Sequence, residues 1–239
     1  MQKDYDAAHA ERAAVNAARL KSYRTKVGKL IYTQPCVRAD VAYCISRVSR
    51  AQTFPTEALE AHVDRIIVYL AQTADLGVTF NGSVKGAGQM FAESDSDWSV
   101  GHSTTGWVIY FGGAAVAFAA KRQACITMSS TEAELVAASA CAKEIVYYKT
   151  LAREMGLEQG AVQLFVDNSG AVELSRDRKS CHRSRHVDRR YFKVRELSYE
   201  GVLKVEHINT ADNSADVLTK VLPAKVHGKH CRRIFNLGE

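Results

Sequence analysis

The stretch Ser129-Ser130-Thr131-Glu132-Ala133-Glu134-Leu135 predicts the start of the helix around which the rest of the chain is organised. Ser129 can cap the free backbone N–H groups, and Glu132, three residues later, completes a capping box. Apolar residues then recur at helical spacing until Gly156 stops the helix. Glu134 falls at the border of the face that should be buried, which is unusual for a surface carboxylate.

The composition indicates a folded, reduced, intracellular protein. The chain has 239 residues, 46% of them hydrophobic, enough for one large domain or two small ones. Its six cysteines include no CxxC pair, which fits free thiols better than a disulfide framework. We expect a cytoplasmic particle or the nucleus as its location. No signal peptide or membrane-spanning apolar run is apparent, so no membrane partner is expected.

The formal net charge of +6 is concentrated in one segment. Between Arg176 and Arg195 there are nine Lys or Arg and two Asp, so this segment carries +7 and the rest of the chain −1. A concentrated cationic segment on a nearly neutral body is typical of nucleic-acid binding. The alternative is a solvated helix face.

The order of elements favours an α/β fold after a helical start. We expect helices over residues 39–50 and 56–73, a break at Gly77, and a boundary that divides the chain into domains 1–77 and 78–239. Short apolar stretches at 78–80, 89–93, 106–111 and 114–120 read as strands, with Asn81-Gly82 and Gly112-Gly113 as hairpin signals. The helix from Ser130, strands at 162–166 and 203–208, and a last helix from about Asp212 complete a mixed sheet with helices packed on it.

Four carboxylates fall at the ends of these elements: Asp95, Glu134, Asp167 and Asp216. Functional groups gather where the strands of an open sheet end, so these acids could meet. Converging carboxylates repel one another unless cations lie between them, and Mg²⁺ ions would meet that need. Taken singly, each acid also has a structural interpretation as a turn or cap residue.

From Val27 to about Leu222 the chain resembles the C-terminal part of the Pol polyprotein of copia-type LTR retrotransposons. The matching pieces, in order, are SDSDW at residues 94–98 (SDADW in the family), STTG at 103–106 (STSG), KRQ at 121–123 (SKRQ), SSTEAE at 129–134 (SSTEAE), VDN at 166–168 (CDN) and ADVLTK at 215–220 (ADILTK). Residues 1–77 resemble the tail of the reverse transcriptase that precedes this domain.

The resemblance implies a ribonuclease H-like fold, with a five-stranded mixed sheet flanked by helices. Its metal-binding and catalytic acids would be Asp95, Glu134, Asp167 and Asp216, with Asp97 as the rival of Asp95. Two Mg²⁺ ions, with Mn²⁺ as a substitute, would serve hydrolysis of the RNA strand of an RNA–DNA hybrid during reverse transcription. The upstream reverse transcriptase of a parent polyprotein is a further expected partner.

The motifs and the cationic segment also suggest residues that contact the hybrid. These are Lys121, Arg122, Gln123, Asn168, Arg183, Arg185, His186, Arg189 and Arg190. Recognition would use backbone, groove shape and 2′-hydroxyls rather than base sequence. We expect Trp98 to be a core residue beside the sheet edge, and we do not expect His207, inside a predicted strand, to act as a catalytic histidine.

Alternative functions remain open at this point. The chain departs from the family in a shorter loop between Trp98 and Ser103 and in Phe192, which replaces a family His. A catalytically inactive or domesticated fragment that binds nucleic acid without cutting is therefore the main alternative, and an exonuclease or resolvase is another. The chain has no Asp-Asp pair, so polymerase activity is not expected. The Cys and His residues do not have the spacing that a tetrahedral zinc site requires.

Overall fold

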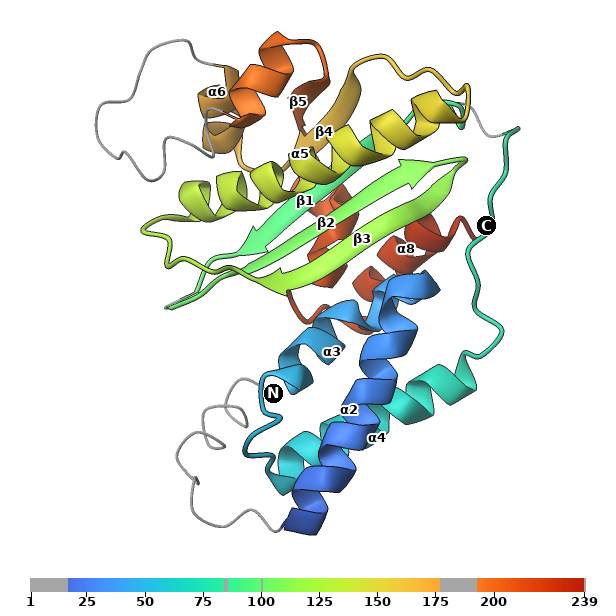
Figure 1. The fold of residues 1–239 in the computed structure, drawn as a ribbon, viewed down its shortest axis with the longest axis vertical. Helices are drawn as coiled ribbons and strands as arrows, with labels where there is room; N and C mark the ends of the chain where they lie inside the picture. The colour runs from blue at the N-terminus through green and yellow to red at the C-terminus, as the bar shows by residue number, and fades with distance from the viewer. Residues whose placement is uncertain (1–16, 84–85, 100, 177–192, 239) are drawn as a thin grey trace. The chain divides into compact units, whose positions relative to one another are not determined.

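The computed structural model describes residues 17–83, 86–99, 101–176 and 193–238, without the side chains of residues 34–36. The chain divides into two compact units, residues 1–77 and 78–239, which are described separately below (Figure 1). That the first unit is a reverse-transcriptase tail stays a prediction. No helix in the described part of the chain is both long and apolar enough to cross a bilayer.

The first unit consists of helices in its described residues. They are α2 (Ala17–Val37), the 3₁₀ turn η1 (Ala39–Val41), α3 (Ala42–Ser49) and α4 (Glu57–Gln72). Their apolar faces enclose a core of Tyr23, Val27, Leu30, Val41, Ile45, Val48, Ala51, Leu59, Val63 and Ile66. The buried Arg38 fixes the turn at η1, because it donates to both oxygens of Asp40 and to the carbonyl of Thr73, 3.1 Å away.

The second unit is built on a five-stranded mixed sheet in the order β3-β2-β1-β4-β5. The strands are β1 (Phe91–Asp97), β2 (Thr104–Phe111), β3 (Ala114–Arg122), β4 (Val162–Val166) and β5 (Leu203–His207). β1, β2 and β3 pair antiparallel, whereas β4 and β5 run parallel to β1. The sheet confirms the expected architecture, and β1 at its centre touches both halves.

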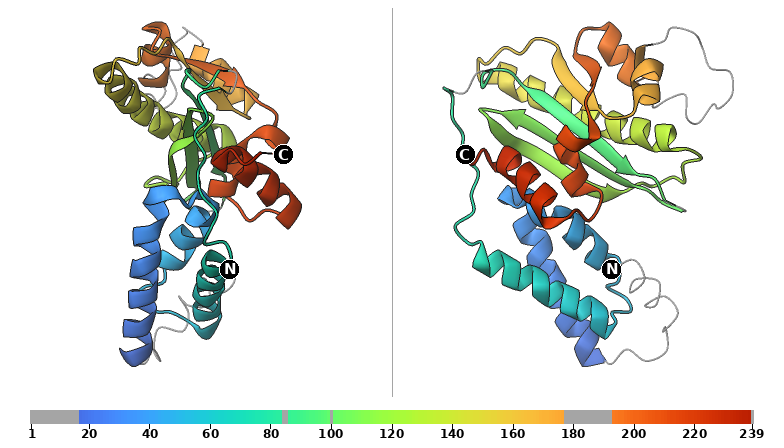
Figure 2. Two further views of the ribbon diagram at one scale, coloured as in Figure 1. Left: turned by 90° about the vertical axis from the view of Figure 1, so that its right-hand side faces the viewer. Right: turned by 180° about the vertical axis from the view of Figure 1, so that it is seen from behind.

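Helices cover both faces of this sheet, as Figure 1 and the view from behind in Figure 2 show. α5 (Ser130–Glu154) and α6 (Ser169–Arg176) lie on one face, and the 3₁₀ turn η3 (Ser214–Leu218) and α8 (Ala224–Phe235) lie on the other. A further helical segment covers residues 193–199, and a short 3₁₀ turn, η2, covers Thr210–Asp212. The core between sheet and α5 includes Ala92, Ile109, Leu135, Ala138, Ile145 and Leu164.

The capping signals predicted from the sequence are present at the ends of α5. Ser129 Oγ accepts a hydrogen bond from Glu132 N–H at 3.1 Å, and Glu132 Oε2 accepts one from Met128 N–H at 2.8 Å. At the other end Gly156 has a φ of +77°, a left-handed conformation that suits glycine. The Gly112-Gly113 hairpin is also confirmed, since both residues have positive φ between β2 and β3.

One predicted strand is absent, and several predicted boundaries were wrong. Residues 78–80 form no strand. Thr79 N–H donates to the Phe235 carbonyl at 2.9 Å, so this segment is bound to the end of α8 and does not pair with a β-strand. β1 extends four residues beyond the predicted 89–93 strand, so Asp95 lies within it. Asp216 belongs to the turn η3, and the last α-helix begins only at Ala224.

Candidate metal centre

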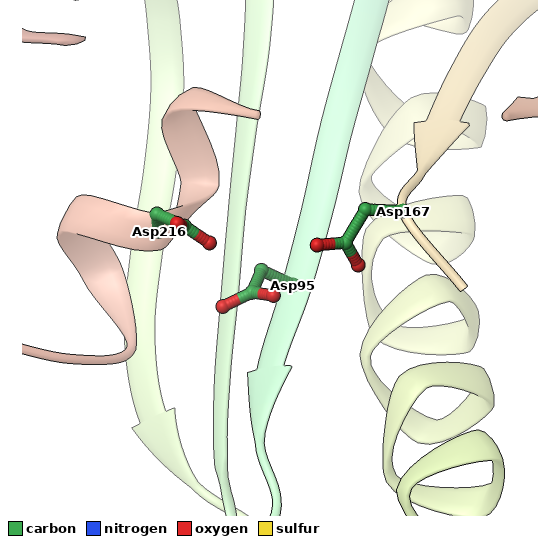
Figure 3. Close-up of side chains that lie close together, drawn as sticks. All are labelled: Asp95, Asp167 and Asp216. Atoms are coloured by element: carbon green, nitrogen blue, oxygen red, sulfur yellow. The ribbon is translucent and has the colours of Figure 1, made fainter. Parts of the chain in front are cut away.

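The site is assembled where β1 passes between β2 and β4. Asp95 projects from β1, Asp167 directly follows the last residue of β4, and Asp216 comes from η3 (Figure 3). One carboxylate oxygen from each of the three lies within 4.8 Å of the others. Asp95 and Asp216 are buried, with 2% and 5% of their surface exposed, and Asp167 is partly buried. The structure therefore brings together three of the four predicted acids.

Glu134, the fourth predicted acid, faces this cluster from α5. Its Oε1 accepts hydrogen bonds from the backbone N–H and the hydroxyl of Ser96, both at 3.0 Å. Ser96 is the residue after Asp95, so these bonds join the helix to β1 beside the three aspartates. The other oxygen, Oε2, is buried and has no hydrogen-bond partner among the described residues.

η3 is fixed to β1 by buried polar contacts on either side of its start. Asn213 donates from its amide to the Ser94 carbonyl at 3.0 Å, and Ser214 N–H donates to Glu93 at 2.8 Å. Gly106, opposite Asp95 on β2, lets η3 approach the sheet. A Cβ there would lie 2.6 Å from Thr219 Cγ2 and 2.8 Å from Leu218 Cβ.

Lys220 and Thr219, at the end of this turn, supply the contacts that offset the charge of the cluster. Lys220 Nζ lies 2.7 Å from Asp216 Oδ1 and 3.8 Å from Asp95 Oδ2. The Thr219 hydroxyl donates to Asp95. Sequence reasoning did not assign a role to either residue, although both belong to the ADVLTK motif, and Lys220 lies one helical turn beyond Asp216.

Three of these acids, Asp95, Glu134 and Asp216, have a raised pKa because they are buried. Burial raises the pKa of Asp95 to about 7, against the opposing effect of the Lys220 ammonium. Burial also raises the pKa of Glu134 well above its usual range, and the nearby Asp95 and Asp167 carboxylates add to this. The pKa of Asp216 is raised by burial as well. A cluster of this kind favours either bound protons or a bound cation.

The residues present fit a divalent cation. Oxygen ligands from carboxylates are those that Mg²⁺ prefers, and three of them already converge. A charged carboxylate in a buried setting is costly without a positive partner, and one oxygen of Glu134 has no hydrogen-bond partner within the described part of the chain. Asp97, the rival of Asp95, is outside this group and accepts from Thr104 N–H instead.

Apart from Gln123, the predicted nucleic-acid contacts divide into three sets. Lys121 and Arg122 are exposed at the end of β3. Asn168 accepts from Ala171 N–H at 3.0 Å, and so caps α6 next to Asp167. Arg183, Arg185, His186, Arg189 and Arg190 lie outside the described residues.

Gln123 does not fit its predicted role. Only 4% of it is exposed, and its amide donates to Thr105 Oγ1 at 3.1 Å and to the Ala133 carbonyl at 3.0 Å. Gln123 thus joins β2 to the start of α5 and positions Glu134, rather than reaching out to a ligand. The signal missed in the sequence was that a glutamine placed directly before a helix-entry loop can donate both to a side chain of the neighbouring strand and to a backbone carbonyl at the start of the helix.

Two further predictions concern aromatic side chains near the site. Trp98, expected in the core, has 55% of its surface exposed, so that prediction was wrong. His207 ends β5 opposite Val166, the residue before Asp167, and its side chain is exposed. It is not part of the group of ligand atoms identified among the described residues.

Sequence comparisons identify relatives among transposon polyproteins. The chain is 35% identical over 206 residues to the retrovirus-related Pol polyprotein from transposon TNT 1-94 of Nicotiana tabacum. The matched region covers 84% of this chain and 15% of that polyprotein. The chain is 32% identical over 206 residues to the Pol polyprotein from transposon RE1 of Arabidopsis thaliana, which covers 84% and 14%. The chain therefore spans about one seventh of these relatives. No protein-family model matches it.

Among solved structures, an RNase H1 isolated from compost superimposes with a TM-score of 0.45 and 16% identity, covering 55% of this chain and 93% of that one. RNase H1 from the archaeon Halobacterium salinarum gives a TM-score of 0.41 and 22% identity, covering 55% and 94%. The strand order β3-β2-β1-β4-β5, with its antiparallel first half and parallel second half, confirms the five-stranded mixed sheet expected from the sequence.

Proposed function

Because the chain is a relative of the Pol polyproteins of copia-type retrotransposons, we propose that its second unit is a metal-dependent ribonuclease H. Its substrate would be the RNA strand of an RNA–DNA hybrid, cut during reverse transcription. The observation that carries the proposal is the convergence of Asp95, Asp167 and Asp216 within 4.8 Å, beside Glu134. The upstream reverse transcriptase would be a partner, with the first unit as its tail.

Asp95, Glu134, Asp167 and Asp216 would hold two Mg²⁺ ions, with Mn²⁺ as a substitute. When bound, these ions would activate water for attack on a phosphodiester and stabilise the leaving 3′ oxygen. The protein keeps the ligands in place: Ser96 orients Glu134, and Thr219 orients Asp95.

Charge outside the acid cluster supports a polyanionic substrate. Lys121 and Arg122 are exposed at the end of β3, on the same antiparallel half of the sheet as Asp95. Phosphate contacts position a nucleic acid without reading its bases, which suits an enzyme that must cut along any transcript. The segment between Arg176 and Arg195 would add to this attraction.

The test is cleavage of a 5′-labelled RNA strand in an RNA–DNA hybrid, with Mg²⁺ or with EDTA. Cutting of RNA alone, dependent on Mg²⁺, is expected. Loss of a residue that only supports a metal ligand typically costs about 10- to 100-fold, so Asp167→Asn, which removes a charged ligand itself, should lower the rate by at least about 100-fold. Asp97→Asn is the matched control: its amide oxygen can still accept from Thr104 N–H, so the rate should stay within about 3-fold of the unaltered protein.

Hybrid binding without any cutting, in the unaltered protein with Mg²⁺ or Mn²⁺, would favour the alternative of an inactive nucleic-acid-binding fragment. Cleavage of DNA duplexes at a similar rate would indicate a different nuclease on this fold.

A further inference from the structure

Trp98 is exposed but held in a fixed position. Its indole N–H donates to the Thr127 carbonyl at 3.3 Å, while 55% of its surface faces solvent. Thr127 is itself 4% exposed, and its hydroxyl lies 3.3 Å from the Ser103 hydroxyl. The other tryptophan, Trp107, is 6% exposed within β2. An anchored aromatic ring that faces solvent requires an explanation that packing does not give.

Two other large apolar side chains lie on either side of Thr127. Ile126 is 61% exposed and Met128 is 84% exposed. Their backbone is anchored as well, since Met128 N–H donates to Glu132 at the start of α5. We name Trp98, Ile126 and Met128 the apolar platform. Single exposed apolar residues are common, but three on one anchored loop pair are typical of a binding surface.

The apolar platform adjoins the acid cluster. Trp98 is three residues after Asp95, so its Cα lies at most about 10 Å from that of Asp95 at 3.3 Å per residue. Between them, Ser96 holds Glu134. Across the sheet, Arg122 of β3 lies opposite Thr104 of β2, and Thr104 lies opposite Asp97 of β1. The exposed Arg122 is therefore two strands away from Asp97, at the same end of the sheet.

We propose that the apolar platform binds the sugar and base-edge surface of the RNA–DNA hybrid in its minor groove, next to the cleaved bond. This inference rests on the proposed function. A hybrid presents a wide, shallow minor groove in which C–H faces of the sugars lie beside the 2′-hydroxyls and base edges, and an aromatic ring can lie against those faces whatever the base sequence. Lys121 and Arg122 would attract the neighbouring phosphates, so the charges around the platform match this ligand.

The experiment uses the fact that the chain has two tryptophans, one exposed and one buried. The full chain carrying Asp167→Asn, which prevents cutting, is titrated with a short RNA–DNA hybrid while tryptophan emission and its quenching by acrylamide are recorded. The hybrid should protect Trp98 from acrylamide. In the same background, Trp98→Phe should abolish that change, because only the buried Trp107 remains.

Affinity provides a second measurement. Trp98→Ala should weaken hybrid binding by about 5- to 100-fold, the range expected for loss of an aromatic contact with nucleic acid. Trp98→Phe should keep most of the affinity, since the ring remains. Met128→Ala should weaken binding more than Met155→Ala, a matched change at an equally apolar exposed residue at the far end of α5.

Hybrid binding that leaves Trp98 fully open to acrylamide would overturn the apolar platform while the proposed function still stands. A shift of Trp98 emission with rising protein concentration, without hybrid, would also overturn it, because a second copy of the chain would then cover the platform. If the unaltered protein neither binds nor cuts the hybrid, the proposed function fails first and the platform with it.

Discussion

Gly106 on β2 lies directly opposite Asp95 on β1, and it is the absence of a side chain at Gly106 that lets η3 bring Asp216 to Asp95. A Cβ at this glycine would lie 2.9 Å from the Ala215 carbonyl, closer than a carbon atom can approach. The backbone contact is therefore part of the site, although Gly106 carries no chemical group.

Gly106→Ala should displace η3 and impair metal binding. Forcing one methyl group into a packed contact costs about 1–3 kcal/mol, so the melting temperature should fall by roughly 2–10 °C in a domain of this size. Mg²⁺ should then stabilise the variant less than the unaltered protein, because Asp216 is moved. Differential scanning calorimetry with and without Mg²⁺ measures both effects.

Gly228→Ala is the matched control for this change. A Cβ at Gly228, within α8, meets nothing within 4 Å, and alanine favours a helix over glycine by about 1 kcal/mol. This variant should melt higher, with the Mg²⁺ effect unchanged. An equal fall in melting temperature in both variants would mean that the site does not depend on the close approach of η3 to Gly106.

Lys220→Met tests whether the ammonium group compensates the acid cluster. Lys220 Nζ is 2.7 Å from Asp216 and 3.8 Å from Asp95, so its loss removes the ammonium group that is paired with these two buried carboxylates. In EDTA at pH 8 we expect a loss of about 1–3 kcal/mol, less than for a fully buried pair because Lys220 is partly exposed. Thermal unfolding should show Mg²⁺ recovering much of this loss.

Lys204→Met is the control for loss of a lysine charge. Lys204 pairs with Glu206 on the solvent-exposed side of β5, and surface pairs contribute little, about 0–1 kcal/mol. A Lys220→Met protein as stable in EDTA as Lys204→Met would refute the compensating role of Lys220.

How far the sequence predicts this site depends on the kind of interaction. The start of α5 was predictable because Ser129 and Glu132 bond to backbone groups only a few residues away. The sheet was predictable from its apolar stretches and motif order. Thr219 and Lys220 were missed because their partner Asp95 is more than a hundred residues earlier, and nothing local to either segment reveals the register that joins them.

The predictions for the aromatic and amide residues near the site were wrong for a related reason. Trp98 was expected in the core because tryptophan is usually buried, yet its single hydrogen bond to Thr127 fixes it at the surface. Gln123 was expected to face a ligand as part of the KRQ motif, yet its amide donates to Thr105 and Ala133 inside the protein. Side-chain direction after the last residue of a strand depends on the loop, which local pattern does not determine.

The pH dependence of metal binding follows from the raised pKa of Asp95. Because the folded protein holds this proton up to about pH 7 and the unfolded chain only to about pH 4, the metal-free protein should lose stability as pH rises from 4 through 7. Binding of Mg²⁺ displaces the proton, so the increase in melting temperature with Mg²⁺ should grow between pH 5.5 and pH 8. An increase that is the same at both pH values would contradict this.

Arg233→Met tests Glu93, which with Asp95 is one of the two buried carboxylates of β1. Glu93 is fully buried, its pKa is raised by burial, and its partners are Arg233 from α8 and the N–H and hydroxyl of Ser214. Since Ser214 begins η3, this contact fixes the segment that carries Asp216. Removal of a partner from a buried charge pair costs about 3–5 kcal/mol, and partial exposure of Arg233 should reduce this to about 2 kcal/mol.

The expected result is a melting temperature lower by roughly 4–8 °C and a weaker Mg²⁺ effect, measured by calorimetry. Arg232→Met, the neighbouring exposed arginine, is the control and should change stability by less than about 0.5 kcal/mol. The contrast between adjacent arginines separates loss of the Glu93 contact from loss of charge on α8. If Arg233→Met lowers stability but leaves the Mg²⁺ effect intact, then η3 keeps Asp216 in place without help from α8.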